Sequence, residues 1–504
     1  MITLTLRSIV RRLGLFAVFV SLCCNPSLFA ADVTGHWRVL RHTDDGNTLE
    51  TFLDLKQEGS KLTGTVLVSW GDLQISDGQV DDNKISFTAD VFRYDGDIAG
   101  DRMNLTQHDP NIGAISVSAM RMPAHAVPSP ARLPVPPLHV VPNNGLASTP
   151  PMGWNSWNFF HDKIDDSTVR QIADAMVARG MRDVGYAYVN VDDTWQGSRD
   201  ANGRIHPNKK FPDMKALVDY VHAKGLKIGI YSSPGPKTCG GYEGSYGHEE
   251  QDARTFAEWG IDYVKYDWCS AFRIYHDSEM RAVYQKMGDA LRESGRPMVY
   301  SLCQYGKEDV WKWGKLVGGN LWRTTNDIED NALSMFRNAE AEVDLAPWAE
   351  PGHWNDPDML ETGNGSMSAD EYRAHMTFWS ILAAPLIAGN DLRNMTQETR
   401  AILINSEVIA IDQDALGKQG RRMRKNGNVE VWTRPLVEGA VALAIFNLGV
   451  TDTPVTVSWQ DLGISNVKNV RDLWAQRDLP DAGIQYSGTV KGHGAQLVRL
   501  ETRR

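Results

Sequence analysis

Apolar and polar residues alternate in short runs along the segment from Val33 to Met120. Three of these runs are 35–40, 62–68 and 84–89, and clusters of turn-forming residues such as 44–47 separate them. Alternation with a period of two, broken by frequent turns, predicts an antiparallel β-meander that forms either a small barrel or a sandwich. No group of catalytic side chains stands out there. We therefore predict that residues 31–121 form a binding or spacer module.

After about residue 150 the pattern changes to short apolar runs with amphipathic helical segments between most of them. The runs are 152–154, 186–191, 226–231, 261–266, 297–302, 320–324, 354–356 and 385–388. Helical patterns cover 166–179 and 214–224, and Gly225 follows the second as a helix C-terminus requires. Eight runs of this kind predict an α/β fold, a (β/α)8 TIM barrel, over residues 149–412. The alternative is an open doubly wound sheet, but no Gly-rich phosphate loop follows any run.

Two further changes of pattern flank this domain. Residues 122–148 contain seven prolines, which predicts an extended, semi-rigid linker. Beyond residue 412 the helical pattern stops and alternating runs return at 428–434, 440–446, 453–458 and 494–500. Residues 413–504 are therefore predicted to form a C-terminal antiparallel β-sandwich.

The N-terminus has the pattern of a secretory signal peptide over residues 1–30. Three arginines precede an apolar run at 13–24, and small residues follow at Ala30 and Ala31. The apolar run is too short to cross a bilayer, so we expect a secreted or periplasmic protein with no membrane span. Export would leave three of the five cysteines in the mature chain: Cys239, Cys269 and Cys303. One disulfide and one free thiol are then expected, and counting does not decide which pair closes.

Composition narrows the function classes. The 504 residues are 42% hydrophobic and 23% charged, which is typical of a soluble globular protein. The net charge of −11 argues against nucleic acid as a partner, because phosphate binding needs clustered lysine and arginine. No oligomeric state follows from these patterns.

Polar and aromatic residues gather where the predicted barrel strands end, which is where the chemistry of such barrels lies. These residues are Trp157, Asp192, Asp193, Tyr231, Lys265, Asp267, Gln304, Arg323, Asp327 and Asp358. Carboxylates, amides and cations suit sugar hydroxyls, and aromatic rings suit the C–H faces of a sugar. A single aspartate at a strand end is often only a helix cap, but sugar-compatible residues at successive strand ends are hard to explain by capping.

Two of these aspartates, Asp267 and Asp327, lie at the ends of different strands and could face each other across a pocket. A glycosidic bond is usually cleaved by two carboxyl groups. A metal hydrolase is the rival chemistry on the same barrel, but it needs clustered histidines and acids. Only His353 lies near a strand end, so we expect no metal and no cofactor.

The chain resembles glycoside hydrolase family 27, the family of α-galactosidases and α-N-acetylgalactosaminidases, from residue 149 to about the C-terminus. The resemblance rests on TPPMGWNSW (149–157), VDD (191–193), KIGIY (227–231), KTCGG (237–241), VKYD (264–267), WNDPDM (354–359), APL (384–386), IAIDQD (409–414) and LGKQG (416–420). Residues 31–148 lie outside it. The resemblance implies a (β/α)8 barrel and a retaining mechanism, with Asp267 as nucleophile and Asp327 as general acid/base.

The resemblance also implies contacts with a galactose ring. Asp192 and Asp193 are expected to hold O4 and O6, Lys265 to reach O3 and O4, and Arg323 to hold O2. The pocket would be lined by Trp157, Tyr231, Asp358 and Met359. Cys239 and Cys269 match the family's disulfide beside the nucleophile, which leaves Cys303 free.

Two positions depart from the family. Thr194 stands where many members have a second disulfide cysteine after the aspartate pair, and Gln304 stands where α-galactosidases often place a glutamate near O2. We therefore expect an exo-acting α-galactosidase with a carbohydrate as its partner. The alternative on the same machinery is a β-L-arabinopyranosidase, because that sugar is galactose without its C6 group. A carbohydrate-binding pseudoenzyme has no support, since both carboxylates are present.

Overall fold

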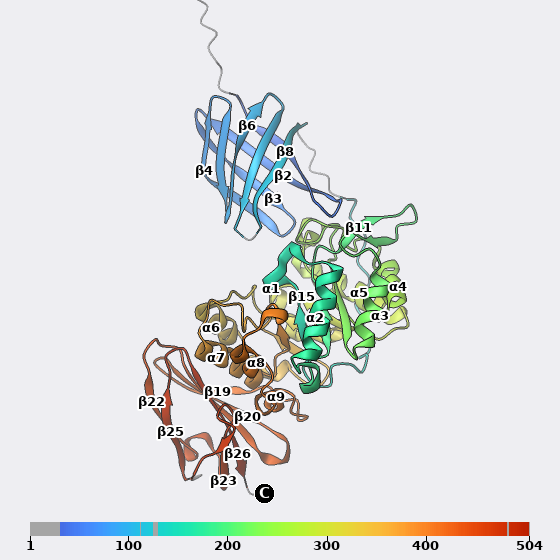
Figure 1. The fold of residues 1–504 in the computed structure, drawn as a ribbon. Helices are drawn as coiled ribbons and strands as arrows, with labels where there is room; N and C mark the ends of the chain where they lie inside the picture. The colour runs from blue at the N-terminus through green and yellow to red at the C-terminus, as the bar shows by residue number, and fades with distance from the viewer. Residues whose placement is uncertain (1–30, 111, 124–129, 481–482, 503–504) are drawn as a thin grey trace, which may run out of the picture.

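The structure, a computed structural model, describes residues 31–110, 112–123, 130–480 and 483–502. The predicted signal peptide lies outside this part of the chain. Among the described residues no helix combines the length and apolar character needed to cross a membrane. In the view of Figure 1 the N-terminal strands, in blue, and the C-terminal strands, in red, lie at opposite ends of a central α/β domain.

The N-terminal strands form a closed antiparallel barrel, so of the two predicted alternatives the barrel is the one present. The strands are β1 (Gly35–His42), β2 (Thr48–Glu58), β3 (Lys61–Val68), β4 (Gly71–Asp81), β5 (Lys84–Ala89), β6 (Phe92–Ala99), β7 (Arg102–Asp109) and β8 (Gly113–Met122). Each strand pairs with the next, and β8 pairs back with β1. Because alternate residues of a strand point to opposite faces, one set fills the barrel with a core that includes Trp37, Leu55 and Met103.

The central domain contains eight parallel strands in the hydrogen-bonded order β17-β16-β15-β14-β13-β10-β9-β18. They are β9 (Met152–Asn155), β10 (Tyr188–Asn190), β13 (Lys227–Ser232), β14 (Tyr263–Asp267), β15 (Val299–Cys303), β16 (Leu321–Arg323), β17 (Trp354–Asp356) and β18 (Leu386–Ala388). Leu360, four residues after β17, forms a parallel bridge with Ala388 of β18 and so links the two edges of the sheet. This order and direction fit the predicted (β/α)8 barrel.

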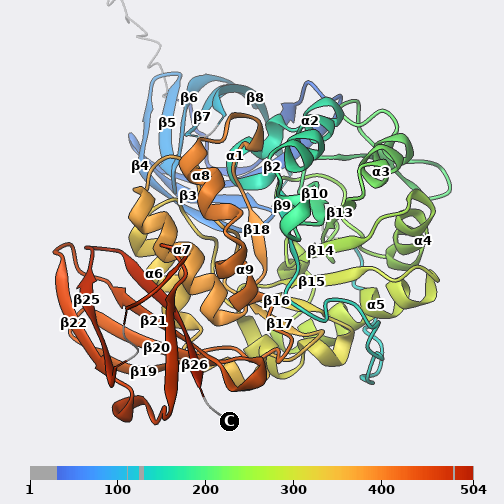
Figure 2. The same ribbon diagram turned by 60° about the horizontal axis from the view of Figure 1, so that its bottom comes forward.

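Helices surround these strands, as Figure 2 shows for α2 to α5. They are α1 (Trp157–Phe160), α2 (Asp166–Ala178), α3 (Met214–Ala223), α4 (Glu249–Trp259), α5 (Met280–Glu293), α6 (Ala332–Ala341), α7 (Ala369–Leu382), α8 (Gln397–Leu403) and α9 (Ser406–Asp412). A short hairpin of β11 (Gln196–Arg199) and β12 (Ile205–Pro207) follows β10. Between β15 and β16 the connection is two 3₁₀ segments, Lys307–Lys312 and Gly314–Val317.

Helix starts are fixed by the capping residues that the sequence supplies. The side chains of Asp165 and Asp213 accept backbone N–H groups at the starts of α2 and α3. Ser368 and Glu371 form a capping box at the start of α7. These contacts satisfy backbone donors that have no partner inside the helix.

The proline-rich segment before the barrel packs against the central domain. Described residues 130–148 contain no helix or strand. The side chain of Gln285, on α5, contacts the backbone of Pro137 and His139, and the side chain of Asn144 bonds Met298 and Asn320 just before β15 and β16. The linker therefore follows α5 to the amino-terminal ends of the barrel strands, where β9 begins.

The C-terminal strands form an antiparallel domain that packs on α7. The strands are β19 (Arg421–Asn426), β20 (Val429–Pro435), β21 (Val441–Asn447), β22 (Thr453–Ser458), β23 (Val467–Asp472), β24 (Arg477–Asp478), β25 (Gln485–Val490) and β26 (Ala495–Thr502). Six of them form one sheet, and β22 and β25 pair separately. At the interface the ring of Phe378 on α7 stacks on Phe446 with centroids 3.4 Å apart.

The N-terminal barrel is attached to the central domain through the turn between β1 and β2. Asp45 in this turn is buried, and its carboxylate accepts a hydrogen bond from the Tyr242 hydroxyl at 2.7 Å. The Asn208 amide and the Lys210 ammonium lie 3.3 and 3.8 Å from the same oxygen. A buried carboxylate needs such partners to offset its lost hydration. The contacts of Asp45 therefore fix the position of this turn on the central domain.

A second turn of the N-terminal barrel, between β3 and β4, also contacts the central domain. The Ser270 N–H donates to the Ser69 carbonyl between β3 and β4. Arg273 also donates to the carbonyls of Val68 and Gly71, at 3.0 and 3.1 Å. Ser270 follows the end of β14 by three residues, so the N-terminal barrel stands over the carboxyl-terminal rim of the central barrel.

Replacing Asp45 with alanine is expected to weaken this attachment by about 2–3 kcal/mol, because hydrogen bonds to a charged group are lost while their donors stay buried. Calorimetry on the full chain should show a lower unfolding temperature for Asp45→Ala. The neighbouring Asp44, which is exposed, supplies the control Asp44→Ala. Equal unfolding temperatures for the two variants would contradict the assigned role of Asp45.

Candidate active site

The carboxyl-terminal ends of the barrel strands bring most of the predicted residues together. Asp192 and Asp193 follow β10, Tyr231 lies in β13, and Lys265 and Asp267 lie in β14. Gln304 follows β15, Arg323 ends β16, and Asp358 and Met359 follow β17. All of these except the partly buried Lys265 are buried. Trp157, which begins α1, is partly exposed, and the side chain of Asp327, in the loop after β16, is 70% exposed.

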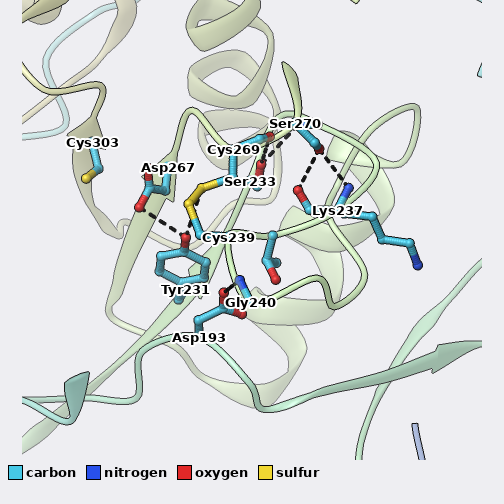
Figure 3. Close-up of a disulfide and its surroundings, with 12 residues drawn as sticks. Asp193, Tyr231, Ser233, Lys237, Cys239, Gly240, Asp267, Cys269, Ser270 and Cys303 are labelled. Carbon is cyan, nitrogen blue, oxygen red and sulfur yellow. Dashed lines mark hydrogen bonds between the residues drawn. A yellow bond between two sulfur atoms is a disulfide. The ribbon is translucent and has the colours of Figure 1, made fainter. Parts of the chain in front are cut away.

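The carboxylate of Asp267 is held by two tyrosine hydroxyls. Tyr231 donates to one oxygen at 3.0 Å, a contact drawn in Figure 3, and Tyr305 donates to the other at 2.8 Å. Burial raises the pKa of Asp267 to about 6, the nearby Lys265 charge opposes this rise, and the Asp327 charge adds to it. The carboxylate is thus oriented at both oxygens and lies within electrostatic reach of Asp327.

A lysine and an amide hold Asp192. The Lys265 ammonium lies 2.9 Å from one carboxylate oxygen of Asp192, and the Asn155 amide donates to the same oxygen at 2.7 Å. Lys265 precedes Asp267 by two residues on the same strand, so both side chains point to the same face of β14. The Lys265 ammonium therefore lies between the carboxylates of Asp192 and Asp267, which are on neighbouring parts of the rim.

Arg323 links two further acids. Its Nη2 atom lies 3.0 Å from Asp327 Oδ1 and 3.0 Å from Asp358 Oδ2. Asp358 Oδ2 also accepts a hydrogen bond from the Ile328 N–H at 2.9 Å, so two donors hold this carboxylate oxygen. Asp358 adopts a positive φ of 89°, which is strained for a residue with a side chain and is typical of functional sites.

The implied disulfide between Cys239 and Cys269 is present, and Cys303 is free and buried. The bond connects the loop after β13 to the end of β14, two residues beyond Asp267. Gly240, next to Cys239, donates its N–H to Asp193 at 2.7 Å, as Figure 3 shows. Burial raises the pKa of Asp193 to about 6, and this N–H opposes the rise. The disulfide therefore fixes a loop that contacts one acid and borders another.

Gln304 is fully buried, and neither atom of its side-chain amide has a hydrogen-bond partner among the described residues. An unpaired buried amide is costly, so a ligand hydroxyl that reached it would remove a penalty as well as form bonds. Met359 is buried directly after Asp358, and its thioether supplies no charge or strong hydrogen bond.

Two contacts were not predicted from the sequence: the Tyr305 hydroxyl on Asp267 and the Asn155 amide on Asp192. Asn155 belongs to the GWNSW segment of the first strand, and Tyr305 is the second residue after β15. Their positions at strand ends were a usable signal. Their particular partners depend on backbone turns, including a positive φ of 62° at Tyr305, which the residue pattern does not indicate.

One group of three potential metal ligands occurs in the described part of the chain: Cys239, Asp267 and Cys269. The two sulfur atoms are joined to each other, so they are not thiolates and do not offer the ligand form that metals bind.

Carboxyl groups gathered on a polar, aromatic-lined rim of a parallel α/β barrel fit one class of protein, the glycoside hydrolases. The family model described as "Alpha galactosidase A" matches residues 149–414, and the model described as "Alpha galactosidase C-terminal beta sandwich domain" matches residues 426–500. The chain belongs to this α-galactosidase family, which confirms the resemblance drawn from its motifs.

Individual relatives agree with the family models. An α-galactosidase of Cyamopsis tetragonoloba is 46% identical over 366 residues, covering 71% of this chain and 88% of the relative. The crystal structure of α-galactosidase I from Mortierella vinacea matches with a TM-score of 0.68 and 37% identity, covering 72% of this chain and 99% of that one.

A solved candidate α-galactosidase/melibiase from Bacteroides fragilis matches with a TM-score of 0.69 and 32% identity over 92% of this chain and 91% of its own. This coverage is wider than the central and C-terminal domains alone provide, so the likeness extends into the residues before position 149.

Proposed function

We propose that this protein is a retaining exo-glycosidase that hydrolyses terminal α-D-galactosyl residues from oligo- or polysaccharides. Its membership of the α-galactosidase family supports this activity. The single observation that carries the mechanism is the Asp267 carboxylate, oriented by two tyrosine hydroxyls beside the Asp327 charge. The Cys239–Cys269 disulfide suits an oxidising compartment and supports our proposal that residues 1–30 direct export.

The reaction would proceed in two displacements. In the first, an Asp267 oxygen attacks the anomeric carbon, the bond to the leaving oxygen breaks, and the proton of Asp327 passes to that oxygen. In the second, ionised Asp327 takes a proton from water, the water oxygen attacks the same carbon, and Asp267 is released. Arg323, 3.0 Å from Asp327, would hold the acid/base in position through both steps.

The buried charges of the rim would recognise the galactose ring. Asp192 and Asp193 are proposed to accept from the O4 and O6 hydroxyls, and Lys265 to donate to O3 and O4. Arg323 and the Gln304 amide, which has no partner in the described part of the chain, would contact O2, with Trp157, Tyr231, Asp358 and Met359 lining the pocket. Each carboxylate offers several acceptor sites, which matches a ring whose hydroxyls point in different directions.

The activity and the nucleophile can be tested together with p-nitrophenyl α-D-galactopyranoside and p-nitrophenyl β-L-arabinopyranoside. We expect faster hydrolysis of the galactoside, and a loss of at least about 10⁴-fold in kcat for Asp267→Ala, the order of loss seen when a catalytic nucleophile is removed. Asp219→Asn, an exposed aspartate on α3, is the matched control. A preference for the arabinoside would show that the enzyme is a β-L-arabinopyranosidase instead. An Asp267→Ala enzyme that stays active would show that Asp267 is not the nucleophile.

The acid/base can be tested by comparing leaving groups. Asp327→Ala is expected to lower kcat/KM for raffinose by about 10²–10⁴-fold, because the sugar oxygen then leaves without a proton. α-D-Galactopyranosyl fluoride should be affected far less, since fluoride needs little protonation to depart. Glu308→Gln removes an exposed carboxylate after β15 and controls for the loss of charge. Equal losses on both substrates would argue that Asp327 is not the proton donor.

The nucleophile must be ionised to attack, and burial places the pKa of Asp267 at about 6. We therefore expect kcat/KM to fall about tenfold per pH unit below pH 6. Tyr305→Phe removes a hydrogen bond that favours the ionised form, so its acidic limb should move up by about one pH unit. Tyr220→Phe, on α3 and bonded to Asp174, is the hydroxyl-deletion control. A limb that stays in place or moves to lower pH in Tyr305→Phe contradicts the assigned contact.

A further inference from the structure

A cavity of about 1060 Å³ lies between the N-terminal barrel and the rim of the central barrel. Trp157, Tyr305 and Asp327 line it from the rim, and Trp70 and Gln107 line it from the N-terminal barrel. Small-molecule sites usually measure about 300–1,000 Å³, so this one has room for more than a single sugar ring.

The cavity continues into one end of the N-terminal barrel. Val39, Leu53, Tyr94 and Val117 line it, come from four strands and belong to the set of residues that points into the barrel. Deeper in the same barrel the space is filled by core side chains that include Trp37 and Leu55. The barrel is thus a cup, closed at depth and open toward the active site.

The position of Asp327 decides what this cup would hold. In the proposed mechanism Asp327 gives its proton to the oxygen that links galactose to the rest of the substrate, so the leaving group must lie beside it. Asp327 itself lines the cavity and its side chain is largely exposed. The space beyond Asp327 in the direction of the leaving group is therefore bounded by the N-terminal barrel.

We propose that the open end of the N-terminal barrel binds the leaving group of the substrate, and that this leaving group is a short oligosaccharide of one or two sugar units. The proposal rests on the proposed α-galactosidase activity. It gives the N-terminal module the role of a selector for substrate length.

The side chains around the opening suit sugar rings. Trp70, 44% exposed in the turn between β3 and β4, offers a ring face for the C–H side of a sugar. The bonds from Ser270 and Arg273 described above hold the backbone of this turn, and so the segment that carries the ring, in place. Arg41 and Gln107 add polar groups for hydroxyls, and Arg41 is oriented by Asp162 at 3.0 Å.

Because the cup is closed at depth, it limits the length of the leaving group that it can hold. A polysaccharide whose galactose is a side branch carries its backbone in two directions from the attachment point, and the N-terminal barrel stands where part of that backbone would run. A trisaccharide ends within the available space. The enzyme is therefore expected to act on raffinose more efficiently than on galactomannan, per terminal galactose.

The test uses the full chain and compares raffinose with α-D-galactopyranosyl fluoride, whose one-atom leaving group occupies none of the cup. For Trp70→Ala and Gln107→Ala we expect kcat/KM for raffinose, divided by that for the fluoride, to fall about 2- to 12-fold, the range for one lost ring or polar contact. Met120→Ala is the matched control, because Met120 is 45% exposed, lies on β8 and does not line the cavity. Circular dichroism and unfolding temperature check that the variants fold.

A reduced ratio in either variant, with an unchanged ratio in Met120→Ala, supports the leaving-group site. An unchanged ratio in both variants overturns it, and so does equal efficiency on raffinose and galactomannan. If octyl α-galactoside is hydrolysed much faster than raffinose, the site takes an apolar leaving group and the assignment to sugars is wrong. Failure of the wild-type protein to hydrolyse the fluoride would instead overturn the proposed activity itself.

Discussion

The structure depends on keeping several carboxylates buried at the rim of one barrel. Asp192 and Asp193 follow β10, Asp267 ends β14 and Asp358 follows β17, and a buried charge is tolerated only when it is paired or hydrogen-bonded. Lys265 compensates Asp192 and Arg323 compensates Asp358, while hydroxyl and backbone donors serve the other two. Because each partner comes from another strand or loop, the acids can be satisfied only when the barrel is complete. The same requirement that shapes the fold therefore assembles the site.

The placement of the N-terminal barrel explains the course of the linker. This module stands over the carboxyl-terminal rim, whereas the first strand of the central barrel begins at the opposite end. The chain must therefore pass along the whole height of the central barrel between them, and an extended proline-rich segment covers that distance at low conformational cost. Its bonds to Gln285 and to the residues before β15 keep it against α5 and off the open rim.

The strands of the central barrel were predictable because buried parallel strands appear as nearly continuous apolar runs, such as Val299–Cys303. Their common direction then brought the strand-end residues to one rim. The turn around Asp45 was predictable only as a turn, because its partners Asn208 and Tyr242 lie more than 150 residues away. The cup could not be predicted for the same reason: the alternation predicted a β-meander that forms a barrel or a sandwich, but not that one end of it would meet the active site.

Stability and activity place opposite demands on the buried acids. Asp193 and Asp267 have pKa values near 6 in the folded protein and near 3.8 in the unfolded chain, so the folded state holds protons more tightly between these values. Their contribution to stability is greatest below about pH 4 and is lost as pH rises through 6. Asp267 must be ionised to attack, so the enzyme works above about pH 6, where the two aspartates no longer contribute this stability. The residues just after Asp267 are restrained in two ways. The Cys239–Cys269 disulfide ties them to the loop after β13, and the bond from Ser270 to Ser69 ties them to the N-terminal barrel.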